Sequence, residues 1–333
     1  MFKNPSQQID GRSLWAAAWV TPRNKHMTQV LNLPAGMHVF ERGWLSANNI
    51  LFIGKDANSL IDSGYCTHAQ QTLALVETVL RDRPLDVLIN THLHSDHCGG
   101  NAALQRRYPQ LQILIPPGQA GHVTQWDEDA LTYRPTGQLC PRFEFFQTLR
   151  PGTEVRLGSG QWQIHSAAGH DPHSIVLFEP VAKLLVSADA LWENGFGVVF
   201  PELEGTEAFA EVAATLDLIE RLRPKIVIPG HGPVFKYTPE ILNRARQRLD
   251  AFIDNPVKHA RHAVKVLLKF KLLEVQQQSI EKFADWAVST SYFEQIRKRF
   301  FPSVPFDIWL AQLFVELAAA GVAKRIENDI LNC

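Results

Sequence analysis

The cysteines of this chain lack the spacing of a disulfide framework. Four of them, Cys66, Cys98, Cys140 and Cys333, are spread over 333 residues, and none belongs to a C-x-x-C pair. Secreted domains that depend on disulfides carry closely spaced, paired cysteines. We therefore expect free thiols in a reducing compartment.

Long apolar runs are also missing. The stretch from Leu14 to Val20 is much shorter than the ~20 apolar residues that span a bilayer, and the segment Met1–Pro5 lacks the apolar core of a signal peptide. The sequence thus predicts a cytoplasmic protein that does not associate with a membrane.

An excess of charge of one sign is absent as well. Lys and Arg number 33 against 34 Asp and Glu, so the formal net charge is −1 and no overall field attracts a polyanion. The part from Ile241 onward is modestly basic, which a solvated helical surface explains better than a binding patch does. We expect a small-molecule substrate and not a nucleic acid.

Short β-type runs alternate with helical patterns up to about residue 235. Helical apolar spacing covers 67–82 and 206–222, whereas 118–147 reads as irregular. The expected strands lie at 37–41, 49–53, 59–62, 86–90, 111–115, 160–165, 174–178, 183–187 and 225–229. This alternation is typical of an α/β domain.

From about Pro239 the pattern becomes almost wholly helical. The Asp254–Pro256 break is a plausible linker because a residue before proline is disfavoured in a helix. We divide the chain into a catalytic domain of residues 1–245 and a helical domain of residues 246–333.

The last helix of this tail carries an apolar stripe that has to be buried against something. The stripe consists of Trp309, Leu310, Leu313, Phe314 and Leu317. A short strand is expected after this helix. We expect the tail to cap the active site or to support a homodimer.

The densest chemical motif is His92-Leu-His94-Ser-Asp96-His97, directly after the strand at 86–90. Neutral imidazole is the commonest nitrogen ligand of zinc. Residues two apart on an extended segment share a face, so His92 and His94 can reach one ion together. Asp96 and His97 turn away and can serve a second ion.

Three later ligand-type residues also follow expected strands. They are His170, Asp189 and His231, in the contexts Gly-His, Ser-Ala-Asp-Ala and Pro-Gly-His-Gly-Pro. Functional groups are commonly held at such strand ends by a rigid scaffold.

These motifs together resemble the metallo-β-lactamase superfamily. The segment Thr91–Gly100 resembles its H-x-H-x-D-H signature, the three later residues follow in its usual order, and Asp62 lies in a segment similar to its early Asp-x-Gly turn. The likeness covers about residues 30–235. It implies an α/β fold, a four-layer αββα sandwich, followed here by a C-terminal helical module that resembles the winged-helix-like tail of some relatives.

The resemblance also implies a role for each ligand-type residue. His92, His94 and His170 would hold one metal, Asp96, His97 and His231 would hold the other, and Asp189 would bridge the two. Asp62 would orient a ligand from the second shell, although a simple turn carboxylate is the alternative. The implied cofactor is zinc, two ions per chain, with Mn²⁺ or Fe²⁺ as alternatives.

The implied chemistry is hydrolysis. Two neighbouring metal ions can share a hydroxide and supply it near neutral pH, while Asp96 holds its metal and can accept a proton from the water. The substrate would be a small-molecule ester, thioester, lactone or amide. The alternatives are a ribonuclease-like phosphodiesterase whose tail binds nucleic acid, through a basic run such as Arg297-Lys-Arg299, and a non-catalytic metal-binding protein.

Four further residues are candidates for the wall of the substrate site. They are Tyr133, His173, Trp192 and Phe196, chosen because they stand near the motifs or in expected loops. Aromatic residues in such positions are also common in cores.

Overall fold

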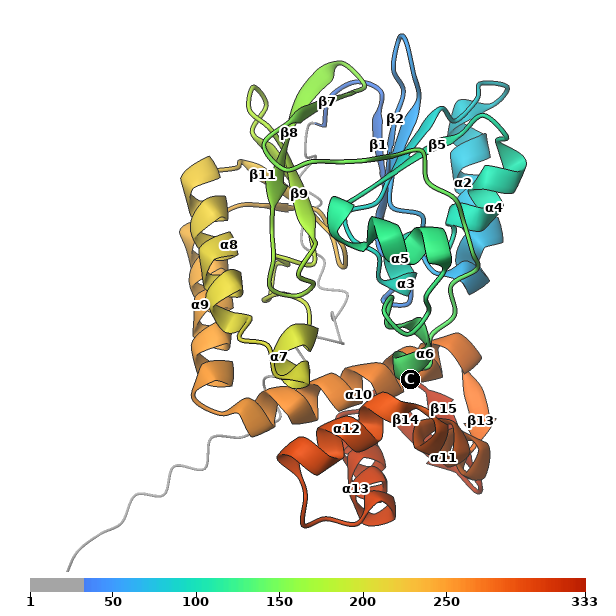
Figure 1. The fold of residues 1–333 in the computed structure, drawn as a ribbon, viewed down its shortest axis with the longest axis vertical. Coiled ribbons are helices and arrows are strands. Elements are labelled where there is room, and N and C mark those ends of the chain that lie inside the picture. The colour runs from blue at the N-terminus through green and yellow to red at the C-terminus, as the bar shows by residue number, and fades with distance from the viewer. Residues whose placement is uncertain (1–32) are drawn as a thin grey trace, which may run out of the picture.

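The computed structural model describes residues 33–333, so the early run Leu14–Val20 and the segment Met1–Pro5 lie outside the described residues. Two six-stranded sheets form the centre of the molecule (Figure 1). The first has the order β1-β2-β3-β4-β5-β6, with the bounds Met37–Phe40, Asn49–Phe52, Ser59–Ile61, Val87–Ile89, Gln112–Ile115 and Gln147–Thr148. The second has the order β12-β11-β10-β9-β8-β7, with the bounds Phe235–Lys236, Ile226–Pro229, Leu184–Ala188, Ile175–Glu179, Gly160–Ser166 and Glu154–Leu157.

The strands carry continuous apolar runs whose side chains point alternately to the two faces of each sheet, so each face packs against a hydrophobic core. In β2, Ile50 and Phe52 belong to the cluster between the two sheets, whereas Leu51 belongs to the cluster under the helices. Successive strand side chains point to opposite faces, so a continuous apolar run is buried on both. Ile61 and Leu60 of β3 divide in the same way.

Helices cover the outer face of each sheet and complete four layers. The first sheet is covered by elements between its strands: η1 (Cys66–His68), α2 (Ala69–Leu80), α3 (Ser95–Cys98), α4 (Asn101–Arg107), η2 (Pro117–Gln119), α5 (Ala120–Gln125) and α6 (Tyr133–Thr136). The second is covered by α8 (Phe209–Leu222) and α9 (Pro239–Ile253), with α7 (Phe200–Glu204) at one end. The expected αββα sandwich is confirmed, and the segment 118–147, expected to be irregular, contains short helices.

The C-terminal module contains strands as well as helices. It comprises α10 (Pro256–Val275), β13 (Gln277–Ser279), α11 (Ile280–Ser289), α12 (Ser291–Phe300), α13 (Phe306–Ala319), β14 (Ala323–Ile326) and β15 (Asp329–Asn332). The strands form a small sheet in the order β13-β15-β14. The expectation of an almost wholly helical tail is therefore incomplete, since β13 begins directly after α10 and the polar residues of the hairpin hide its pattern.

The boundary expected at residues 245 and 246 falls inside α9. Ala245 and Leu249 of this helix pack with the second sheet, so α9 belongs to the sandwich. Helical structure is interrupted instead at Asp254 and Asn255, between α9 and α10. The Asn255 side chain caps α10 by accepting a hydrogen bond from the Lys258 amide. None of the helices within residues 33–333 has the length and apolar character needed to span a bilayer.

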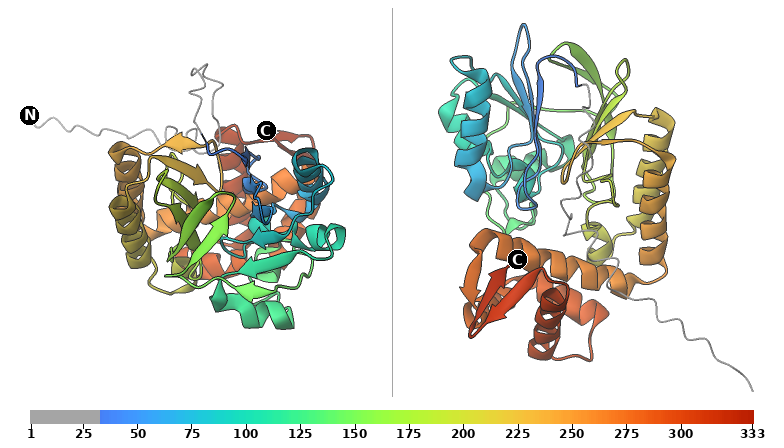
Figure 2. Two further views of the ribbon diagram at one scale, coloured as in Figure 1. Left: turned by 90° about the horizontal axis from the view of Figure 1, so that it is seen from above. Right: turned by 180° about the vertical axis from the view of Figure 1, so that it is seen from behind.

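Helix α10 runs beneath both halves of the sandwich and joins them to the module (Figure 2). Apolar residues of α10, α11, α12 and α13 form one cluster with Val198 and Leu203 of the sandwich. Four residues of the α13 stripe are buried in this cluster, Trp309 and Leu313 completely, and Phe314 is partly buried against it. The module is thus packed on the sandwich, directly below the strand ends described next.

Candidate metal centre

The strands of both sheets deliver ligand-type side chains to one edge of the sandwich. Asp62 follows β3, the His92 motif follows β4, His170 follows β8, Asp189 follows β10 and His231 follows β11. β3 and β4 are parallel, as are β10 and β11, so the carboxyl ends of each pair meet at the same edge. Folding therefore brings together residues that are far apart in the sequence.

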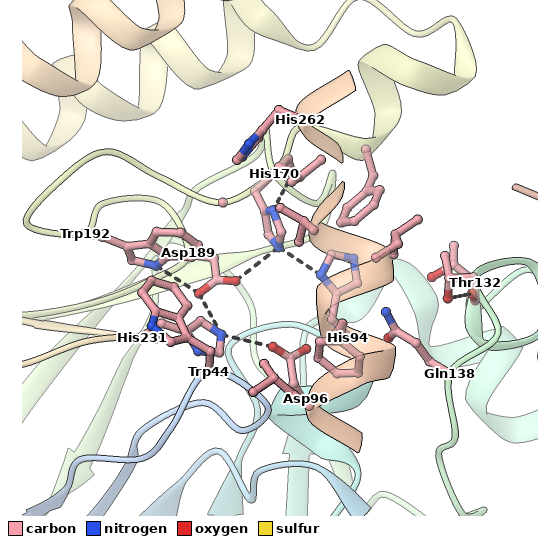
Figure 3. A pocket seen from close by; sticks show the side chains of 18 of the residues that line it. Trp44, His94, Asp96, Thr132, Gln138, His170, Asp189, Trp192, His231 and His262 are labelled. Atoms are coloured by element: carbon pink, nitrogen blue, oxygen red, sulfur yellow. Dashed lines mark hydrogen bonds and ion pairs between the residues drawn. The ribbon is translucent and has the colours of Figure 1, made fainter. Parts of the chain in front are cut away.

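The first group, called here the histidine cluster, consists of His92, His94 and His170. Its three ligand nitrogens lie within 4.8 Å of one another. His92 Nε2 is 3.1 Å from His94 Nδ1. His94 Nδ1 is in turn 2.8 Å from His170 Nε2 (Figure 3). Three imidazoles converge on one point, as a metal ion requires.

The second group, called here the carboxylate cluster, consists of Asp96, His97, Asp189 and His231. Its four ligand atoms also lie within 4.8 Å of one another. His231 Nε2 is 3.0 Å from Asp96 Oδ2, and His97 Nε2 is 3.5 Å from Asp189 Oδ1. This cluster adds two carboxylates to two imidazoles.

Asp189 lies between the clusters and offers one oxygen to each. Its Oδ1 is near His97 and accepts a hydrogen bond from Trp192 Nε1, while its Oδ2 is 3.3 Å from His170 Nε2 (Figure 3). A carboxylate in this orientation can join two metal ions.

The backbone around Asp189 is shaped for this position. A register shift separates Val186 from Ala188 at the end of β10, and Ala188 has a φ of 45°. Bulges at strand ends re-aim side chains, and left-handed non-glycine residues cluster at functional sites. Opposite, a Cβ on Gly230 would lie 2.2 Å from Asp189 Oδ1, so only glycine leaves room for the carboxylate.

Neighbours hold one ring nitrogen of His170 and one of His97, so that the other nitrogen of each ring faces inward. His170 Nδ1 donates to the Val198 carbonyl, and His97 Nδ1 donates to Asp62 Oδ2 at 2.8 Å. Asp62 also accepts from the Thr91 amide and hydroxyl, each at 2.9 Å. A hydrogen bond at one ring nitrogen fixes the tautomer and leaves the other nitrogen for a metal.

The burial and protonation of the ligand-type residues are suited to binding metal ions. His97 Nε2 is buried without a hydrogen-bond partner, although a buried polar atom normally has one. Burial and the imidazoles of His97 and His94 hold the pKa of His92 well below its usual range, and burial and His170 lower the pKa of His94 to about 4. His92 and His94 are thus neutral and able to coordinate at neutral pH.

In the carboxylate cluster, the neighbouring charges outweigh the effect of burial on the pKa values. Burial opposes protonation of His97, but Asp189, Asp62 and Asp96 outweigh it and raise the pKa of His97 well above its usual range. Burial likewise opposes ionisation of Asp189, but His97 and His231 hold the pKa of Asp189 well below its usual range. A cation binding here replaces the proton on His97 and meets two ionised carboxylates.

A cavity of about 90 Å³ opens beside both clusters. His94, His170, Asp96, Asp189 and His231 form one side of it. The other side consists largely of α10, through His262, Val266, Leu267, Phe270 and Leu273. The C-terminal module therefore shapes the space in front of the candidate metal centre.

Of the four candidate wall residues, one lines the cavity and three do not. Trp192 lines the cavity and contacts Asp189, and His173 lies against Gly118 at η2, outside the cavity lining. Tyr133 and Phe196 were expected at the substrate site, but both are buried in cores. The Tyr133 hydroxyl donates to the Leu93 carbonyl at 2.9 Å, so it braces the His92 motif from behind.

Sequence reasoning missed the cavity residues that lie far from the motifs. Trp44 stacks on His231 with ring centroids 5.4 Å apart, and Phe200 packs edge-on against His94 at 5.4 Å. Gln138, Arg248 and His262 also line the cavity. Trp44 lies in the loop between β1 and β2, away from the ligand motifs, so no local pattern pointed toward it.

Known proteins resemble the chain in sequence and in fold. The model of the metallo-beta-lactamase superfamily matches residues 42–231. A Beta-lactamase-like protein 2 homolog of Caenorhabditis elegans is 22% identical, over 76% of this chain and 77% of that protein. The Acyl-coenzyme A thioesterase MBLAC2 of Bos taurus is 24% identical, over 57% of this chain and 74% of that protein.

A solved structure shows that the likeness in fold extends to the module. A beta-lactamase domain protein from Burkholderia ambifaria matches 91% of this chain and 94% of its own, with a TM-score of 0.55 and 18% identity. Since the family model covers more than half of the chain, and the His and Asp ligands of its metal site converge as described, the chain belongs to the metallo-beta-lactamase superfamily and is a metal-dependent hydrolase of that superfamily.

Proposed function

We propose that the chain is a dinuclear zinc hydrolase that cleaves a small-molecule ester, thioester, lactone or amide. The observation that carries the proposal is Asp189, which directs one carboxylate oxygen toward each ligand cluster. Zinc is the metal best matched to imidazole and carboxylate donors without a redox requirement, and the two clusters contain seven such donor residues.

Bound in the two clusters, a pair of cations would polarise the substrate's carbonyl and lower the pKa of water. The chain's own groups supply orientation and proton transfer. Asp96 is held by His231 at one oxygen, and His97 and His231 overcome the effect of burial and keep the pKa of Asp96 below its usual value. Asp96 is therefore ionised at neutral pH and can accept a proton from the attacking water.

The cavity favours a substrate with an apolar part. The side formed by α10 presents Val266, Leu267, Phe270 and Leu273 toward the site, and Phe200 stands beside the histidine cluster. Apolar walls with a few fixed polar groups are usual for small-molecule sites. The acyl-coenzyme A thioesterase among the relatives fits this class of substrate.

The nucleic-acid alternative finds little support in the basic run of α12. Arg297 and Lys298 both pair with Glu294, at 2.7 Å and 3.5 Å. The Arg299 guanidinium lies over the ring of Phe300. A phosphate-binding track would need exposed cations without such carboxylate partners.

Metal analysis together with a hydrolysis screen tests the proposal. Protein loaded with zinc should retain about two equivalents, and should cleave aryl esters, acyl thioesters or lactones faster than phosphodiesters or single-stranded RNA. Chelator-treated protein is the control and should be inactive until zinc is restored. A reproducible single equivalent contradicts the dinuclear site. RNA binding at micromolar levels that weakens with salt, or faster cleavage of RNA, favours the phosphodiesterase.

A further inference from the structure

Arg248 of α9 is the one lysine or arginine among the described residues that line the cavity. Its aliphatic stem lies against Gly195, where a Cβ would approach Arg248 Cδ to 2.8 Å. Gly195 has a φ of 126°, a conformation that glycine tolerates best, so the chain leaves both space and backbone freedom for this side chain. The arginine side chain is therefore packed specifically into the cavity wall.

The protein gives this guanidinium no carboxylate partner among residues 33–333. Its one hydrogen bond joins Nη2 to His262 Nε2 at 2.8 Å, and its Nε is buried without a partner. The rings of Phe196 and Phe252 lie 5.7 Å and 5.3 Å from its central carbon. Burial lowers the pKa of Arg248 to about 10, and no acidic group opposes this effect.

His262 cannot supply the missing negative charge. Burial and Arg248 hold the pKa of His262 well below its usual range, so the ring is neutral and accepts the hydrogen bond from the guanidinium. Glu204 lines the same cavity, but its hydrogen-bond partner is Tyr292. A buried cation without a counter-charge is costly, and proteins seldom keep one without a use for it.

The position of Arg248 relates it to the metal centre. The segment that contacts its stem at Gly195 continues to Gly197, where a Cβ would meet the His170 ring, and to Val198, whose carbonyl accepts from His170. Two residues of chain span at most about 7 Å. A short substrate can therefore reach the metal centre with one end and the guanidinium with the other.

We propose that Arg248 is a specificity-determining residue that binds a carboxylate of the substrate, at the end of the molecule remote from the bond that is cleaved. This inference rests on the proposed hydrolase function and narrows its substrate class to acyl compounds with an apolar chain and a second, anionic end. A guanidinium has five N–H donors, of which His262 occupies one, and its planar fork matches a carboxylate. His262 acts as a positioning residue for that fork.

Two 4-nitrophenyl esters of equal acyl length, the hexanoate and the adipate half-ester, test the proposal on zinc-loaded full-length protein. The wild type should show a higher kcat/KM for the adipate half-ester. Arg248→Met should lower the ratio of the two kcat/KM values by about 10- to 100-fold, the usual effect of losing a hydrogen-bonded charge pair. Arg246→Met is the matched control, since Arg246 lies on the same helix and pairs with Asp217 and Glu220 at the surface. It should keep the wild-type ratio.

Arg248→Lys retains the charge without the planar fork and should give an intermediate ratio. It also decides the question if Arg248→Met fails to fold by circular dichroism. An unchanged ratio in the folded variant, or a wild-type preference for the hexanoate, overturns the proposal.

Calorimetric binding of monomethyl adipate, which has one free carboxylate, and of dimethyl adipate, which has none, separates this inference from the proposed function. The wild type should bind monomethyl adipate about 10-fold more tightly, and Arg248→Met should abolish the difference even if neither 4-nitrophenyl ester is hydrolysed. Equal binding of both compounds by the wild type overturns the carboxylate site, whatever the enzyme hydrolyses.

Discussion

The two ligand clusters lie at the same edge of the sandwich and differ in charge. The histidine cluster contains three imidazoles, and burial keeps the pKa of His92 and His94 low. The carboxylate cluster contains Asp96 and Asp189, which raise the pKa of His97. His92 and His94 are therefore neutral before a cation binds, whereas His97 holds a proton beside two ionised carboxylates.

The difference follows from what stands behind each cluster. His170 is oriented by a backbone carbonyl, that of Val198, whereas His97 is oriented by the ionisable Asp62. A carboxylate hydrogen-bonded to an imidazole raises its basicity, and Asp62 is one of the groups that raise the pKa of His97. The same kind of ligand thus serves two positions with different proton affinities, and Asp189 is the group common to both.

Asp189→Ala should have the largest effect, because it removes the one group shared by the clusters. We expect metal content to fall from about two equivalents to one or fewer, and kcat/KM to fall by more than the roughly 10- to 100-fold typical of outer-shell changes. Elemental analysis and ester hydrolysis measure both. Glu193→Ala, which removes an exposed carboxylate of the same loop, is the control. Two retained metals with wild-type activity would show that Asp189 is not the bridge.

Acidification should release the metal of the carboxylate cluster first. A cation there displaces the proton that His97 holds below its raised pKa, so its apparent affinity should fall about tenfold per pH unit as pH drops from 7 to 5. The pKa of His94 is about 4 and that of His92 lies well below its usual range, so protons do not compete for these two ligands of the histidine cluster in this window. Competition with a chromogenic chelator at several pH values measures the two affinities. Parallel loss of both metals contradicts the difference.

The ligands could be predicted from sequence because each follows a strand directly. His92, His170, Asp189 and His231 lie within a few residues of a buried run, and strand ends of one sheet meet at one edge. Sequence pattern could not identify Arg248, because its place depends on how α9 packs beside Gly195. It also misplaced Tyr133 and Phe196, since an aromatic residue near a motif packs equally well behind the site as in front of it.

In the C-terminal module, too, sequence pattern predicted some features and missed those that depend on long-range packing. Its helices were predicted from apolar periodicity, and the buried stripe at Trp309 is confirmed. Its sheet was largely missed, because β14 is mostly exposed and carries no alternating pattern. The packing of α10 on the sandwich includes the contact of Phe270 with Tyr65, a pair 205 positions apart at 5.1 Å that no local pattern reveals.

Asp62→Ala should reduce activity less than Asp189→Ala and should act on one cluster. It removes the acceptor of His97 Nδ1 and of the Thr91 amide. We expect a loss of about 10- to 100-fold in activity, or in affinity for the metal of the carboxylate cluster, with the histidine cluster retained. Equilibrium dialysis against zinc resolves the two sites. Asp86→Ala, whose carboxylate accepts from the Asn58 amide at the far end of β4, is the control. Loss of the histidine-cluster metal alone would refute a selective role.

The smallest effects should come from the aromatic rings beside each cluster. Trp44 stacks on His231 at 5.4 Å with an interplanar angle of 8°, whereas Phe200 packs edge-on against His94 at 5.4 Å. Such ring contacts contribute about 0.5–1.5 kcal/mol, which corresponds to about 2- to 12-fold. Trp44→Leu should therefore weaken the metal of the carboxylate cluster by this factor, and Phe200→Leu that of the histidine cluster.

Trp44→Phe is the control for Trp44→Leu, because it keeps a ring over His231 and should cost less. Separate metal affinities, measured with the chelator competition, are the readout for all three variants. If Trp44→Leu and Phe200→Leu weakened both metals equally, the rings would act through the shared cavity and not through the individual imidazoles. If each substitution instead weakened the metal of the other cluster, the two clusters would be coupled through Asp189.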